Sequence, residues 1–145
     1  VFLVHDDDGD EIAKVFDFGI AKIKPAPGAA HNTAMTRVGT LLGTPQYMSP
    51  EQAKGIAIDA RTDIYALGIL TFECLTGKLP FSTDDVHEVL LLAVAGQLLR
   101  PSQIMRVPPG FDAWFAKATA PRPRDRFDNA KQLASELEEI LLIEP

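Results

Sequence analysis

The sequence predicts an α+β fold that is mainly α-helical and carries one short β-hairpin at its N-terminal end. Two short apolar runs, residues 1–4 and 12–16, flank an acidic turn, and the longer apolar segments follow after residue 60. Apolar residues make up 46% of the 145-residue chain, which suits one globular domain with a core. The single cysteine cannot form an internal disulfide, as is usual in a reducing compartment.

The N-terminal hairpin is predicted from its turn. Asp8-Gly9 is a strong tight-turn dipeptide, and it lies between the two apolar runs. The acidic residues around Gly9 are spaced wrongly for an EF-hand calcium loop, because Val4 occupies the position five residues before the glycine. We therefore interpret the acidic run as a solvated loop.

After the hairpin the sequence loses its periodicity. Residues 24–44 are rich in Pro, Gly, Ala and Thr, which predicts a flexible loop. A short helix is expected at residues 50–54, with Pro50 in its first turn.

Four longer helices are predicted after residue 60. Residues 61–76 are apolar nearly all round, which is typical of a buried helix, and Gly77 ends that helix. A second helix is expected at residues 84–95, with Ser82 or Thr83 as its cap.

The third and fourth helices are expected at residues 111–118 and 129–142. We expect Trp114, Phe115 and Cys74 in the core. One face of the fourth helix is apolar at helical spacing, through Leu133, Leu137, Ile140 and Leu141.

Three motifs occur in a fixed order along the chain. Asp17-Phe18-Gly19 comes first, residues 43–51 then read Gly-Thr-Pro-Gln-Tyr-Met-Ser-Pro-Glu, and residues 63–68 read Asp-Ile-Tyr-Ala-Leu-Gly. Asp-Phe-Gly followed about thirty residues later by a Pro-Glu motif frames the activation segment of protein kinases. Over essentially its whole length, the chain resembles the C-terminal part of a bacterial, eukaryotic-like serine/threonine protein kinase.

Other kinase motifs are missing from these 145 residues: the Gly-x-Gly-x-x-Gly loop, the Val-Ala-Ile-Lys strand and the His-Arg-Asp catalytic loop. In the family all three precede Asp-Phe-Gly. The resemblance therefore implies a protein-kinase-like fold of which this chain is the C-terminal lobe, cut just after the catalytic loop. It would comprise a hairpin (1–16), an activation segment (17–51) and a helical subdomain (52–142), and it should be inactive alone.

The resemblance implies ATP and Mg²⁺ as cofactors, and Ser or Thr residues of proteins as phosphate acceptors. Asp17 would hold the Mg²⁺, since this hard ion prefers oxygen ligands. Phe18 would pack in the core and set where Asp17 points, and Gly19 would permit the backbone turn.

Gly43, Thr44 and Tyr47 would form the platform that receives the substrate. In serine/threonine kinases this threonine hydrogen-bonds groups of the catalytic loop, so its presence argues against a tyrosine kinase. Glu51 and Arg126 would form a buried structural ion pair, because the planar guanidinium fork matches a carboxylate.

Asp63 would anchor the catalytic loop by accepting its backbone N–H groups; a first-turn Asp also suits the helix dipole, and both roles can hold together. In the loop, Thr36 best matches the phosphorylated position of relatives, with Thr33 and Thr40 as weaker candidates. Such a phosphate adds a charge of about −1.5 to −2. Phosphorylation of this loop by the kinase itself would require association with a second copy of the protein.

Two alternatives stay open: a pseudokinase, or a non-catalytic protein-binding module. The intact Asp17-Phe18-Gly19 and Thr44 weigh against a pseudokinase. A net charge of −6, with basic residues clustered only at 122–126, gives no sign of a nucleic-acid surface. The longest apolar run, residues 89–95, is too short to span a bilayer. The resemblance implies a cytoplasmic kinase domain, and leaves open a transmembrane segment elsewhere in the parent protein.

Overall fold

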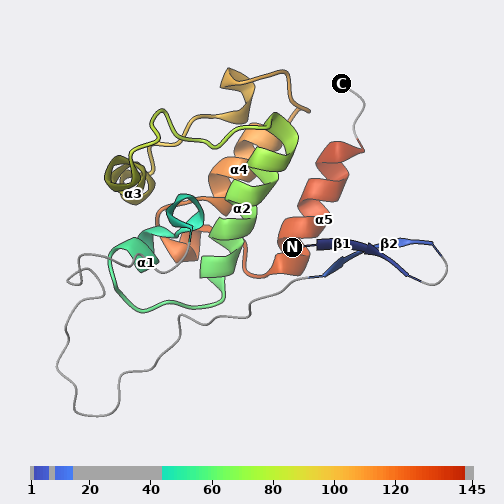
Figure 1. Cartoon of the computed structure of the whole chain (residues 1–145), viewed down its shortest axis with the longest axis horizontal. Helices are drawn as coiled ribbons and strands as arrows, with labels where there is room; N and C mark the ends of the chain where they lie inside the picture. Colours follow the sequence, from blue (N-terminus) through green and yellow to red (C-terminus); the bar gives the residue numbers. More distant parts are fainter. Residues whose placement is uncertain (1, 7–8, 15–43, 143–145) are drawn as a thin grey trace, which may run out of the picture. The chain divides into compact units, whose positions relative to one another are not determined.

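The computed structural model describes residues 2–6, 9–14 and 44–142 (Figure 1). The chain divides into two compact units, Val1–Thr36 and Arg37–Pro145, which we describe separately.

The described part of the first unit is an antiparallel hairpin of strands β1 (Phe2–His5) and β2 (Glu11–Lys14), in which Val4 pairs with Ile12 and His5 with Glu11. Gly9 adopts a φ of 87°, in the left-handed region that favours glycine. The backbone N–H of Asp10 donates to the Asp6 carboxylate at 2.9 Å. The predicted hairpin is thus confirmed.

The described part of the second unit consists of five α-helices and three short 3₁₀ turns. The α-helices are α1 (Pro50–Ala53), α2 (Arg61–Thr76), α3 (Val86–Ala95), α4 (Phe111–Ala118) and α5 (Ala130–Leu141), and the turns are η1 (Pro45–Tyr47), η2 (Pro101–Gln103) and η3 (Pro123–Asp125). The predicted class, helical after one hairpin, is confirmed.

Local signals explain where the helices begin and end. Ser49 and Gln52 form a reciprocal capping box at α1, with Pro50 in its first turn. Helix α2 ends as predicted, because Gly77 takes a φ of 69° and its N–H donates to the Glu73 carbonyl. Helix α5 is capped by the side chain of Asn129.

The predicted start of α3 is wrong. Its cap is Asp85, whose carboxylate accepts the backbone N–H of Glu88 at 2.9 Å. Thr83 instead accepts the N–H of Asp85 at 3.1 Å. Adjacent residues can all cap a helix, so the sequence pattern alone does not choose between them.

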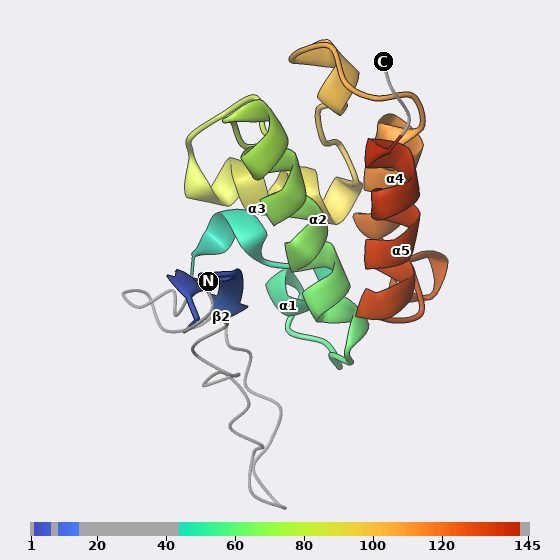
Figure 2. The same cartoon turned by 90° about the vertical axis from the view of Figure 1, so that its right-hand side faces the viewer.

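The core lies where α2, α4 and α5 pack side by side (Figure 2). Trp114 and Phe115 are both 3% exposed, which confirms their predicted burial. The prediction for Cys74 is wrong, because this side chain is exposed. Leu141, at the end of the apolar stripe of α5, is also exposed. The buried members of the cluster are Ile64, Tyr65, Ile69, Phe72, Ala93, Phe111, Trp114, Phe115, Ala118, Phe127 and Leu133.

Helices α2 and α4 are in tight contact at Gly68. A Cβ atom at this position would lie 2.9 Å from both Ala118 Cβ and Thr119 Cγ2. Real Cβ atoms essentially never come so close to other carbons, so a larger residue would force the two helices apart.

We therefore expect Gly68→Ala to destabilise the chain. Overpacking of about 1–3 kcal/mol should outweigh the gain of about 1 kcal/mol in helix propensity. Urea unfolding followed by circular dichroism measures the difference. The second substitution Thr119→Ser removes Cγ2 but keeps the hydroxyl that donates to the Phe115 carbonyl, and it should restore part of the loss. A stabilised single variant would contradict the close packing.

Candidate functional site

Five of the predicted site residues fall in the described part of the chain: Thr44, Tyr47, Glu51, Asp63 and Arg126. The other predicted site residues lie outside the described residues, so their roles stay predictions. They are Asp17, Phe18, Gly19, Thr33, Thr36, Thr40 and Gly43.

The substrate platform is described from Thr44 onward. Thr44 precedes the η1 turn, its backbone carbonyl accepts the N–H of Tyr47 at 3.1 Å, and its side chain is exposed. Within residues 44–142 no group hydrogen-bonds the Thr44 hydroxyl. The hydroxyl is therefore free to meet another molecule or another part of the protein.

Tyr47 ties this turn to helix α2. Its hydroxyl donates a short hydrogen bond to the carboxylate of Glu73. Burial raises the pKa of Tyr47 to about 12, together with the hydrogen bond and the negative charge of Glu73. The phenol thus stays protonated as a donor. Sequence reasoning missed this contact, because no local signal joins residues 26 positions apart.

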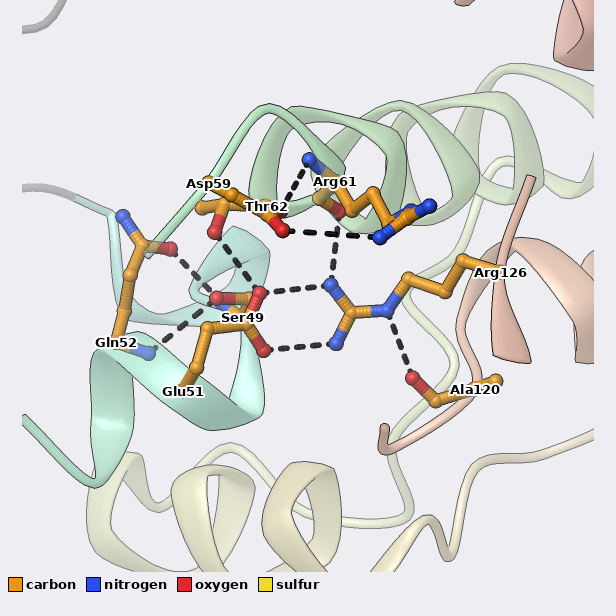
Figure 3. Close-up of polar contacts among 8 residues, drawn as sticks. All are labelled: Ser49, Glu51, Gln52, Asp59, Arg61, Thr62, Ala120 and Arg126. Carbon is orange, nitrogen blue, oxygen red and sulfur yellow. Dashed lines mark hydrogen bonds and ion pairs between the residues drawn. The ribbon is translucent and has the colours of Figure 1, made fainter. Parts of the chain in front are cut away.

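Glu51 and Arg126 come together in a buried, two-pronged ion pair (Figure 3). Arg126 Nη1 lies 2.7 Å from Glu51 Oε1, and Nη2 lies 2.8 Å from Oε2. The two side chains are 0% and 2% exposed. Two parallel hydrogen bonds of this kind join α1 to the segment after η3.

The remaining polar atoms of the pair are also satisfied. Thr62 donates its hydroxyl to Glu51 Oε1 at 2.8 Å. Arg126 donates from Nε to the Ala120 carbonyl and from Nη1 to the Arg61 carbonyl, both at 2.8 Å (Figure 3). Buried charges are tolerated only when they are paired and hydrogen-bonded in this way. We use the name clasp for the five residues Glu51, Arg61, Thr62, Ala120 and Arg126.

The clasp sets the ionisation of Glu51. Burial alone would raise the pKa of its carboxyl, but hydrogen bonds from Arg126, from the backbone and from Thr62, with the charge of Arg126, lower it from 4.5 to about 2. A carboxyl group whose pKa is lowered by folding stabilises the folded state at pH values above its pKa in the unfolded chain. This stabilisation is lost as the pH falls through the pKa of the group in the folded state.

We therefore expect the free energy of unfolding to decline between about pH 4.5 and pH 2, in part through Glu51. Urea unfolding at a series of pH values tests this. Glu51→Gln cannot titrate at this position, so its curve should be flatter over the same range. Equal slopes for the two proteins would show that Glu51 does not carry the effect.

Asp63 lies in the first turn of α2, where its charge suits the helix dipole, and it is exposed. No group among the described residues pairs with its carboxylate. Its predicted role as an anchor requires a His-Arg-Asp loop, which is not among these 145 residues, and remains a prediction.

No group of three or more His, Cys, Asp or Glu side chains in the described ranges is placed to hold a metal ion. In the same part of the chain, none of the helices has the length and apolarity needed to cross a membrane.

The sequence model of the protein kinase domain matches residues 2–140. A probable serine/threonine-protein kinase of Clostridium acetobutylicum is 34% identical over 132 residues, which are 90% of this chain and 19% of that protein. The serine/threonine-protein kinase PknL of Mycobacterium tuberculosis is 37% identical over 135 residues, covering 92% of this chain and 32% of PknL. The serine/threonine-protein kinase PksC of Streptomyces coelicolor is 42% identical over 99 residues, which are 68% of this chain and 18% of PksC.

The chain thus spans less than a third of the length of these relatives. The family match nevertheless covers nearly all of this chain, and the mainly helical fold with one hairpin is that of the C-terminal lobe. The chain belongs to the protein kinase family, and its relatives are bacterial serine/threonine kinases.

Proposed function

We propose that the protein containing this chain is a serine/threonine protein kinase, which moves the γ-phosphate of ATP to a Ser or Thr hydroxyl of another protein. This chain would supply Asp17, the activation segment and the platform at Thr44. The observation that carries the proposal is the way the platform is held: Tyr47 is bonded to α2, and α1 just beyond it is fixed by the clasp.

A rigid platform matters because phosphoryl transfer depends on positioning more than on covalent chemistry by the protein. The exposed Thr44 stands at the start of the η1 turn, and both anchors follow within seven residues of it, at Tyr47 and Glu51. A substrate bound at this turn would therefore contact a rigid surface.

Asp17 is the residue of this chain that would bind Mg²⁺, and its carboxylate is the donor that such a hard cation prefers. The ion would neutralise charge on the phosphate oxygens during transfer. Phe18 and Gly19 would orient Asp17, and the other magnesium ligand, the catalytic base and the phosphate-binding lysine of the family have no counterpart among these 145 residues.

The protein would act in the cytoplasm on other proteins, and on a second copy of itself. Thr36 is the first candidate for autophosphorylation, with Thr33 and Thr40 after it. A phosphate there could order the segment by pairing with an arginine.

We expect the full-length protein to transfer labelled phosphate from ATP and Mg²⁺ to Ser and Thr of a generic protein substrate. The 145-residue chain alone should give only background, because it lacks the motifs that position ATP and accept the proton. Peptide mass spectrometry of the full-length protein should find Thr36 modified first.

Two results would contradict this proposal in different ways. Phosphate transfer by the pure 145-residue chain would refute the expectation that this chain needs further kinase motifs to be active. Absence of transfer by the full-length protein would favour the pseudokinase, or the non-catalytic binding module.

A further inference from the structure

The capping box of α1 begins directly after the platform. The backbone N–H groups of the two residues before Ser49 donate within the η1 turn, each at 3.1 Å. The N–H of Ser49 comes next along the chain, and it donates forward to Gln52 Oε1 at 3.0 Å. The hydrogen bonds of the turn therefore stop short of Ser49, and a side chain from α1 takes over at this residue.

The bond between these two residues lies away from water. Ser49 is fully buried, and Gln52 is half-buried beside it. Gln52 also donates its own N–H to Ser49 Oγ at 3.3 Å, so the two residues hold each other (Figure 3). Without the Gln52 oxygen, the Ser49 N–H would be a buried donor with no acceptor among the described residues, which is an unfavourable state.

The bond fixes one particular peptide plane. Met48 and Ser49 are both extended, with ψ angles of 128° and 157°. Pro50 restricts Ser49 to this extended region, because its ring disfavours a helical conformation in the preceding residue. No such restriction applies to the ψ of Met48, which orients the peptide plane that carries the Ser49 N–H. Gln52 holds that N–H and so fixes the rotation about Met48.

The two anchors described above do not replace this bond. They hold the side chains of Tyr47 and Glu51, one on each side of the peptide plane between Met48 and Ser49. Rotation of this plane would change how the η1 turn is directed relative to α1, and Thr44 lies at the start of that turn.

We propose that Gln52 is a positioning residue of the kinase: it fixes the peptide plane between Met48 and Ser49, and through it the orientation of the platform relative to α1. The inference rests on the proposed function and adds to it a residue that acts through the backbone of the platform. Phosphate transfer requires an aligned acceptor, so the rate falls with the fraction of molecules whose platform is correctly oriented.

The test replaces Gln52 by methionine in the full-length protein. Gln52→Met keeps the length of the side chain but removes the acceptor oxygen. We expect kcat with a peptide substrate to fall about tenfold, as for the loss of one buried hydrogen bond, and the KM for ATP to stay unchanged. Gln52→Glu keeps an acceptor oxygen at the same place in the capping box, so it should retain the kcat of the parent.

Gln103→Met is the matched control. Gln103 Oε1 accepts the backbone N–H of Arg100 at 2.7 Å, which is the same bond over the same spacing, but it lies at the exposed turn η2, which packs on α4. Its kcat should equal that of the parent. Hydrogen–deuterium exchange provides a readout without catalysis: amides of residues 46–53 should exchange faster in Gln52→Met, and at the parental rate in Gln52→Glu and Gln103→Met.

Three kinetic results would overturn the positioning role: an unchanged kcat in Gln52→Met, an equal loss in Gln103→Met, or a Gln52→Glu variant as slow as Gln52→Met. Loss of the folded circular dichroism spectrum in Gln52→Met would also overturn it, since the residue would then serve the stability of the fold. If the parent protein transfers no phosphate, the kinase proposal fails and exchange alone decides. Faster exchange in residues 46–53 would then support the fixed peptide plane, and equal exchange would refute it.

Discussion

Replacing Arg126 by alanine should lower the free energy of unfolding of the 145-residue chain by about 3–5 kcal/mol. The substitution leaves the Glu51 carboxylate buried at 2% exposure, and among the described residues Thr62 is then its one remaining side-chain donor. It also frees the carbonyls of Ala120 and Arg61. An uncompensated buried charge is among the few causes of so large an effect.

Urea unfolding followed by circular dichroism measures this loss. Arg124→Ala is the matched control: Arg124 is an exposed arginine two residues away, whose nearest carboxylate is 3.8 Å distant, and its loss should cost no more than about 0.5 kcal/mol. A second variant, Glu51→Leu combined with Arg126→Met, should be less destabilised than Arg126→Ala, because neither charge remains. Similar losses for Arg126→Ala and Arg124→Ala would show that the clasp does not stabilise the fold.

Asp17→Asn should reduce phosphate transfer by the full-length protein about a hundredfold or more. The amide keeps the shape of the side chain but removes the charge that would hold Mg²⁺, and a bound metal supplies several kcal/mol of transition-state stabilisation. Initial rates at saturating ATP and Mg²⁺ test this expectation.

Asp10→Asn provides the control for Asp17→Asn. Asp10 is an exposed carboxylate of the hairpin, close to Asp17 in sequence, and its neutralisation should leave the rate unchanged. Both variants should keep the circular dichroism spectrum of the parent. An unaltered rate in Asp17→Asn would remove this residue from the site.

The sequence predicted the elements with strong local signals and failed where several signals competed. Helix α2 has the predicted bounds, because its pattern begins at Arg61 and Gly77 stops it. The start of α3 was missed since Ser, Thr and Asp residues stand side by side before it. The Ser49–Gln52 capping box could have been found, because its spacing is a known signature.

The exposure of Cys74 and the polar contacts of the site could be found only from the tertiary structure. The helix around Cys74 is apolar on nearly all sides, so periodicity could not tell which side faces outward. The resemblance named Glu51 and Arg126, yet the carbonyls that complete the clasp belong to Arg61 and Ala120. Backbone acceptors carry no sequence signal, and only the packing of α1, α2 and η3 brings them together.

Trp114 gives the chain an intrinsic spectroscopic reporter. It is the only tryptophan among the 145 residues, and its indole N–H donates to the Leu133 carbonyl at 2.9 Å inside the core. Excited-state emission from an indole responds to the polarity of its surroundings. Detachment of α5 from α4 would bring water to the ring, so the emission wavelength of the unlabelled chain should respond when this helix junction opens.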